Sequence, residues 1–135
     1  MSMKNILRKA LLFATDRHKG QIYDDADFIY HPILTAQLVE MVEPNDLNLI
    51  AAGYLHDVIE NCDVSFHDLE SHFNEDVASL VREVTKTGYN TFPHLKTRRG
   101  YILKFADRLA NLAHVKAWDE DKQQEYLNKS MFWKI

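Results

Sequence analysis

The sequence predicts an all-α protein, a compact bundle of several helices, for three reasons. Apolar residues recur at intervals of three and four along most of the chain, which is the spacing of one helical face. No stretch alternates apolar and polar residues cleanly enough to predict a strand. The 135 residues contain only four glycines and three prolines, few for a protein built on many tight turns. This length predicts one domain, residues 1–135, with a single hydrophobic core.

The first half of the chain predicts three helices. An amphipathic pattern covers residues 4–17 and is followed by a polar loop. A second helix is expected over residues 33–41, with Pro32 in its first turn, where the missing N–H of proline costs nothing. A third helix is expected to begin after a cap at Asn45 or Asp46, because these side chains accept hydrogen bonds from the first free amides.

The second half of the chain predicts four more helices. Ser65 and Asp68 resemble a capping box, with Asp in place of the usual Glu, that opens a short helix. Asn74 is expected to cap the next helix, which has acidic residues in its first turn, as the helix dipole favours. The remaining elements are a loop over residues 87–93, a helix over residues 95–117, and a last helix that is capped by Asp119 and reaches about residue 133.

The composition excludes several classes of partner. The formal net charge is -4 and the pI is about 5.9, so no basic surface for a nucleic-acid polymer is expected. A local cluster of Lys and Arg can still hold a small phosphorylated ligand. Cys62 is the one cysteine, so no intrachain disulfide can form and a reducing compartment is allowed. No window approaches a membrane span, and the first residues lack the apolar run of a signal peptide. We therefore expect a cytoplasmic protein.

A His-Asp pair near the middle of the chain is the first candidate for chemistry. Apolar residues at helical spacing predict that the third helix continues through it, so that His56 and Glu60, at i and i+4, share one face. A histidine nitrogen beside the carboxylate of Asp57 suits a borderline or hard divalent cation. A carboxylate one turn away can handle a proton. On its own, the pair is more often a chance dipeptide at a helix end.

Four residues qualify as ligands of one ion: His31, His56, Asp57 and Asp107. They lie on or near three predicted helices that could converge, and such nitrogen and oxygen sites hold Mn, Fe or Zn. Two of them also have plainer interpretations. His31 can be a loop histidine beside a proline, and Asp107 a solvated helix residue paired with a neighbouring Lys or Arg. The apolar neighbours of Asp107 favour a buried, paired carboxylate.

Four motifs together carry a resemblance to a known family. They are Arg17-His18-Lys19-Gly20-Gln21, Tyr30-His31-Pro32, His56-Asp57-Val58-Ile59-Glu60-Asn61 and Lys104-Phe105-Ala106-Asp107-Arg108-Leu109-Ala110-Asn111-Leu112. Their order and rough spacing resemble those of the HD-superfamily hydrolases. Within that superfamily, the chain is similar to the hydrolase domain of RelA/SpoT proteins and to the stand-alone small alarmone hydrolases. The resemblance runs from about residue 5 to about residue 115.

The resemblance implies an all-helical HD domain that hydrolyses the 3′-pyrophosphate of guanosine tetraphosphate or pentaphosphate, giving GDP or GTP and pyrophosphate. It implies Mn²⁺ as the usual ion, or another divalent transition metal, held by the four candidate ligands. Glu60 matches the carboxylate that helps to activate the attacking water, and Asn111 matches an asparagine near the nucleotide. Candidates for offsetting phosphate charge are Lys19, Lys104 and Arg108. Lys19 is equally compatible with a solvated helix end.

Two departures from the family pattern concern the site. Asn61 stands at a catalytic position where the family usually has an aspartate, and asparagine cannot act as a base. The family also has a basic pair shortly after its Gly-Gln, where this chain has Tyr23, Asp24 and Asp25. We assign Tyr23 to substrate binding, because an aromatic face can stack on a base. The two aspartates would repel phosphates if they pointed inward.

These departures leave alternatives to the expected guanosine alarmone open. One is an HD phosphohydrolase for another nucleotide, such as a deoxynucleoside monophosphate or an adenosine alarmone. The other is a nucleotide-binding or regulatory protein that has lost turnover. The apolar end of the chain, which includes Phe132 and Trp133, is expected either to cap the core or to form a partner surface, which leaves a homo-oligomer open.

Overall fold

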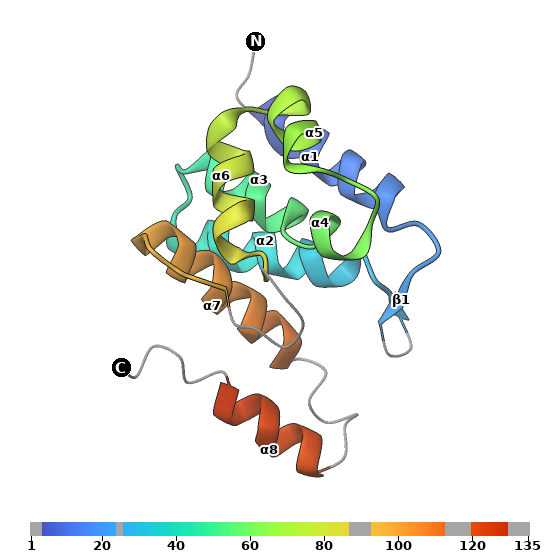
Figure 1. The fold of residues 1–135 in the computed structure, drawn as a ribbon, viewed down its shortest axis with the longest axis vertical. Helices are drawn as coiled ribbons and strands as arrows, with labels where there is room; N and C mark the ends of the chain where they lie inside the picture. The colour runs from blue at the N-terminus through green and yellow to red at the C-terminus, as the bar shows by residue number, and fades with distance from the viewer. Residues whose placement is uncertain (1–3, 24–25, 87–92, 113–119, 130–135) are drawn as a thin grey trace.

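Helices account for most of the chain, and a small hairpin projects at one side (Figure 1). The structure is a computed structural model that describes residues 4–23, 26–86, 93–112 and 120–129. The elements are α1 (Lys4–Arg17), β1 (Ile22–Tyr23), β2 (Ala26–Asp27), α2 (Tyr30–Val42), α3 (Leu47–Leu55), α4 (Val58–Asn61), α5 (Phe66–His72), α6 (Glu75–Val84), α7 (Arg98–Leu112) and α8 (Glu120–Lys129). The predicted all-α fold class is confirmed.

Helix α3 forms the centre of the bundle. It packs against α1, α2, α6 and α7, and Figure 1 shows it enclosed by its neighbours. Its residues Leu49 to Ala52 and Leu55 are buried. A helix that is apolar on nearly all sides belongs in the interior. Because α3 leads directly into the His-Asp pair, the buried centre of the core supports the candidate site.

Helices α2 and α3 approach closely at Gly53. A Cβ atom built on Gly53 would lie 2.8 Å from the Cα of Ala36 and 3.2 Å from its Cβ. Two carbon atoms that are not bonded to one another do not approach as closely as 2.8 Å, so glycine fits between the two backbones and a larger residue would push them apart. This contact determines how near α2, which carries His31, lies to the end of α3, which precedes His56.

Three of the predicted helix caps, at Asp46, Ser65 and Asn74, are present. Asp46 accepts a hydrogen bond from the backbone of α3. Ser65 and Asp68 form the reciprocal bonds of a capping box at the start of α5. Asn74 accepts from the third amide of α6 at 2.8 Å. Pro32 lies in the first turn of α2, as expected, but that helix begins three residues earlier than predicted, so His31 is part of its first turn.

The helix that was expected to carry His56 through Glu60 is interrupted. Helix α3 ends at Leu55, His56 and Asp57 form a turn, and α4 begins at Val58. The Nδ1–H of His56 donates to the carbonyl of Gly53 at 2.8 Å. In a continuous helix that carbonyl would accept from the backbone N–H of Asp57, so the side chain competes with the helix for the same acceptor. The prediction that His56 and Glu60 share one helical face is therefore wrong.

Two further predictions were wrong. The chain does contain two strands, since Ile22–Tyr23 pairs antiparallel with Ala26–Asp27. Each strand has only two residues, which is too short for an alternating pattern to be recognised in the sequence. Helix α7 begins at Arg98 rather than near residue 95, because the Thr97 hydroxyl caps it by accepting from Gly100 N–H at 3.0 Å. The predictions for the loop at 87–92, the helix end at 113–117, the Asp119 cap and the apolar residues 131–133 lie outside the described residues.

Within the described residues, no helix is both long and apolar enough to cross a membrane.

Candidate metal centre and active site

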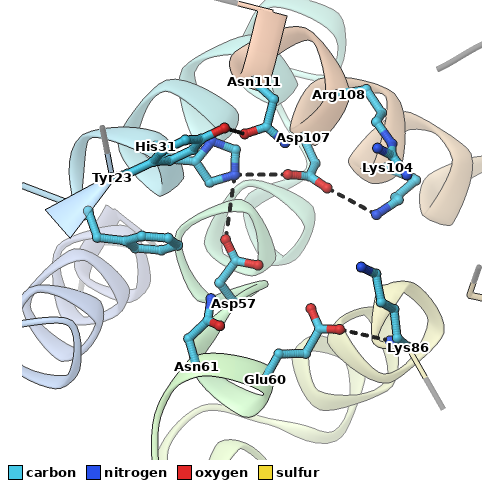
Figure 2. A pocket seen from close by; sticks show the side chains of 11 residues that line it. Tyr23, His31, Asp57, Glu60, Asn61, Lys86, Lys104, Asp107, Arg108 and Asn111 are labelled. Atoms are coloured by element: carbon cyan, nitrogen blue, oxygen red, sulfur yellow. Dashed lines mark hydrogen bonds and ion pairs between the residues drawn. The ribbon is translucent and has the colours of Figure 1, made fainter. Parts of the chain in front are cut away.

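Four side chains from three parts of the fold meet at one point. They are His31 in the first turn of α2, His56 and Asp57 in the turn after α3, and Asp107 on α7. One ligand atom from each lies within 4.8 Å of all the others. Figure 2 shows three of these side chains converging at the wall of a pocket. The structure thus brings together the four residues that the sequence singled out.

The distances within this cluster are short. The Nε2 atom of His31 lies 2.8 Å from Oδ1 of Asp107, and that of His56 lies 2.9 Å from Oδ2 of Asp57. The two Nε2 atoms lie 3.3 Å apart. Two imidazole nitrogens and two carboxylate oxygens form a donor set that suits borderline or hard divalent cations. The residues present therefore fit a divalent metal ion.

Neighbouring groups orient two of these ligands. The bond from His56 Nδ1 to the carbonyl of Gly53 fixes one proton on Nδ1, so that in the neutral imidazole the lone pair of Nε2 faces the cluster. The ammonium of Lys104 lies 3.1 Å from Oδ2 of Asp107 and so leaves Oδ1 for the cluster. Outer hydrogen bonds of this kind are the usual support of metal ligands.

The buried charges of the cluster depend on one another. Burial by itself would lower the pKa of His56, but the attraction of Asp57 and Asp107 outweighs it and raises that pKa well above its ordinary value. Burial would raise the pKa of Asp107, but His56 and a hydrogen bond from His31 hold it well below the usual range. The two carboxylates thus require a positive partner, and a divalent cation would compete with the proton on His56.

A cavity of about 340 Å³ opens next to the cluster. Its lining combines three kinds of side chain: acidic and amide groups, three cations, and two aromatic rings. They are Asp57, Glu60, Asp107, Asn61 and Asn111, then Lys86, Lys104 and Arg108, then Tyr23 and Phe28, with His31 at the cluster. A pocket with a possible cation site, fixed cations and aromatic faces can hold an aromatic ring together with phosphate groups.

The structure separates the predicted substrate-binding residues into two groups. Tyr23, Lys104, Arg108 and Asn111 all line the cavity, as do the two predicted catalytic positions. Lys19 is exposed in the turn after α1 and does not line it. The plainer interpretation of Lys19, a solvated helix end, is the one that its position supports.

Tyr23 closes one side of the cavity. Its hydroxyl donates to Oδ1 of Asn111 at 2.8 Å, which ties the hairpin to α7. Its ring stacks near Phe28, with centroids 6.0 Å apart and planes 26° apart, and meets His31 edge-on. Tyr23 and Phe28 together present aromatic surface beside the His/Asp cluster.

The Arg17–Gln21 motif forms hydrogen bonds that connect it to the segment carrying Glu60 and Asn61. The side chain of Gln21 accepts from Nδ1 of His18 at 2.8 Å and donates to the carbonyl of Asn61 at 2.8 Å. Gly20, at a φ of 85°, supplies the turn that makes this possible. The motif therefore links the end of α1 to the end of α4, where Glu60 and Asn61 lie.

Two lining residues were missed by sequence reasoning. Phe28 is a single aromatic residue with no motif of its own, so the sequence gives no sign of its place in the cavity. Lys86 follows α6 as a single exposed lysine, which resembles a solvated helix end, and the fold alone turns it toward the cavity.

The fold and the site together define a class: a helical bundle with a His-Asp pair and two further candidate metal ligands at a polar pocket. A family model described as "HD domain" matches residues 10–99. The chain belongs to the HD domain family.

Named relatives cover nearly the whole chain. A Xenopus tropicalis protein named guanosine-3′,5′-bis(diphosphate) 3′-pyrophosphohydrolase MESH1 is 30% identical over 90% of this chain and 78% of that protein. The Homo sapiens protein of the same name is 31% identical over 89% of the chain and 78% of its own length. A Vibrio cholerae guanosine-3′,5′-bis(diphosphate) 3′-pyrophosphohydrolase is 31% identical over 93% of the chain. The chain spans only 20% of that longer relative.

A solved structure shares the fold. It was reported as "A metazoan ortholog of SpoT hydrolyzes ppGpp and plays a role in starvation responses". The TM-score is 0.76 at 26% sequence identity, and the match covers 93% of this chain and 82% of that one.

Proposed function

We propose that this protein hydrolyses the 3′-pyrophosphate of guanosine tetraphosphate or pentaphosphate, releasing GDP or GTP and pyrophosphate. The observation that carries the proposal is the composition of one cavity, where a cluster of four side chains that could hold a metal ion adjoins Glu60, three cations and two aromatic rings. A nucleotide with several phosphates suits this lining, because its phosphates can contact a metal ion and the cations while its base stacks on an aromatic ring. Relatives that align with nearly the whole chain carry the name of this activity.

The ion that we propose is Mn²⁺, held by His31, His56, Asp57 and Asp107. When bound, such an ion acidifies a water molecule and withdraws charge from phosphate oxygens. The role of Lys104 is to hold Asp107 by its outer oxygen, so that the carboxylate keeps one orientation whether or not substrate is present.

Glu60 is proposed to accept a proton from the attacking water. It lines the cavity from α4, and its Oε1 atom accepts a hydrogen bond from the backbone N–H of Lys86 at 3.2 Å, which holds the carboxylate in place. The oxygen of water bonds to the phosphorus on the ribose 3′-oxygen, and the bond between that phosphorus and the 3′-oxygen breaks. One water proton passes to Glu60, and the other stays with the oxygen that is added to pyrophosphate. Glu60 then returns its proton to the leaving 3′-oxygen, which departs as a hydroxyl.

Asn61 is proposed to contribute hydrogen bonding and no proton transfer. Its carbonyl is held by Gln21, and its side chain lines the cavity beside Glu60. Where an aspartate would offer a second base, the amide offers an uncharged donor and an uncharged acceptor. We therefore expect turnover to rest on Glu60 alone, with Asn61→Asp raising it.

The other expectations remain part of the proposal. The ligand is a small nucleotide rather than a nucleic-acid polymer, and the reaction takes place in the cytoplasm, since a single cysteine suits a reducing compartment. Tyr23 and Phe28 provide stacking surface, which every purine can use, so an adenosine alarmone is the second substrate to test.

The test is direct product analysis. Pure protein is incubated with Mn²⁺ and guanosine tetraphosphate, and products are separated by anion exchange beside a metal-stripped control and a Glu60→Gln variant. We expect GDP and pyrophosphate from the metal-loaded wild type alone. Metal bound in one equivalent without turnover of any nucleotide in a panel would overturn the proposal and leave a binding protein.

A further inference from the structure

Lys86 lies at the junction of the cavity with α6. Helix α6 ends at Val84, and the buried Thr85 that follows fixes the chain direction by donating from its hydroxyl to the carbonyl of Val81 at 2.6 Å. The next amide, that of Lys86, donates to Oε1 of Glu60 at 3.2 Å. The backbone at Lys86 is therefore anchored on one side in the core and on the other at the proposed base.

The ammonium of Lys86 differs from that of Lys104, which also lines the cavity. Lys104 is buried and paired with Asp107 at 3.1 Å, so much of its charge serves that carboxylate. Lys86 is exposed, and across the described part of the chain its ammonium forms no ion pair with a carboxylate. Figure 2 shows the side chains of Lys86 and Lys104 extending toward one another from the two sides of the pocket.

Two ammonium groups that converge in this way repel one another unless an anion lies between them. The nearby carboxylate of Glu60 does not supply this anion in the structure, because it is the backbone N–H of Lys86 and not the ammonium that contacts its Oε1 atom. A terminal phosphate, with charge close to two, fits such a gap and takes charge-assisted hydrogen bonds from both amines.

We propose that Lys86 is a phosphate-binding residue that takes the terminal phosphate of the 3′-pyrophosphate. This inference rests on the proposed function and names which part of the substrate the residue recognises. The same residue fixes Glu60 through its backbone, so capture of the terminal phosphate and placement of the base occur on one anchored segment. A substrate that carries only a single 3′-phosphate lacks the group that Lys86 binds.

The test separates the side chain from the backbone. Lys86→Met removes the ammonium and keeps the N–H that holds Glu60. Lys96→Met is the matched control, since Lys96 is also exposed but does not line the cavity. For the metal-loaded proteins, KM is measured with guanosine tetraphosphate, and the inhibition constant with guanosine 5′-diphosphate 3′-monophosphate, which lacks the terminal phosphate.

We expect Lys86→Met to raise KM for the tetraphosphate about tenfold, as loss of one charged hydrogen bond does, with the inhibition constant changed less than twofold. Lys96→Met should leave both unchanged. Equal effects of Lys86→Met on both nucleotides, or none on either, would overturn the inference. If the wild type hydrolyses neither nucleotide, the proposed function fails, and calorimetric dissociation constants for the same nucleotides and variants decide the inference separately.

Discussion

Replacing Gly53 with alanine tests how the core sets the geometry of the site. The new Cβ would lie 2.8 Å from the Cα of Ala36, an atom of the backbone that no change of rotamer can move. Alanine in place of glycine within a helix is otherwise favourable by roughly 0.5–1 kcal/mol. Overpacking of a tight core contact costs about 1–3 kcal/mol. We expect the cost of overpacking to exceed the gain in helix propensity, so that the free energy of unfolding falls by on the order of 1–2 kcal/mol.

The assay is urea unfolding of Gly53→Ala beside Gln37→Ala, an exposed position on α2 that should change stability by less than about 0.5 kcal/mol. Metal affinity should fall as well, because the Gly53 carbonyl orients His56 and the contact with Ala36 spaces α3 from α2. The sign is decisive, since helix propensity and close packing predict opposite changes. A Gly53→Ala protein as stable as the wild type, with unaltered metal affinity, would refute this reasoning.

Three more predictions concern the ion, the pH response and the nucleotide. Asp107→Ala should lower bound Mn²⁺ at least tenfold by elemental analysis; one retained equivalent would contradict the site. Arg99 donates to Asp76 and holds its pKa below the usual range. That stabilisation is present above the pKa of aspartate in the unfolded chain and is lost as the pH falls through the pKa of Asp76 in the folded protein. The difference in Tm between the wild type and Arg99→Gln should therefore shrink from pH 7 to pH 3. A difference in Tm that stays constant over this range would contradict the prediction. Tyr23→Phe should raise KM severalfold with kcat unchanged, since the bond to Asn111 is lost; an unchanged KM would remove that role.

The meeting of the four candidate ligands could be predicted because the motifs that carry them are local. His56 and Asp57 are adjacent in sequence, and Asp107 lies among apolar residues of a helix that must face the core. The caps at Ser65 and Asn74 were equally local, since each depends on residues within three positions. Short-range chemistry of this kind is present in the sequence itself.

The remaining features depend on contacts that periodicity does not encode. The turn at His56 follows from a side chain competing for the carbonyl of Gly53, while the apolar pattern continues across it. Lys86 and Lys19 both follow a helix as exposed lysines, and only the packing of the helices turns one of them toward the cavity. The hairpin at Ile22–Tyr23 is too short for its pattern to show.

In the proposed mechanism, water attacks the phosphorus that is bonded to the ribose 3′-oxygen, at a metal site supported by Glu60. The measurement that tests it most directly is mass spectrometry of the products formed from guanosine tetraphosphate in ¹⁸O-labelled water, with and without Mn²⁺. The proposed mechanism predicts one ¹⁸O atom in pyrophosphate, none in GDP, and no products without the metal. Label in GDP, or products that form equally well in metal-stripped protein, would contradict it.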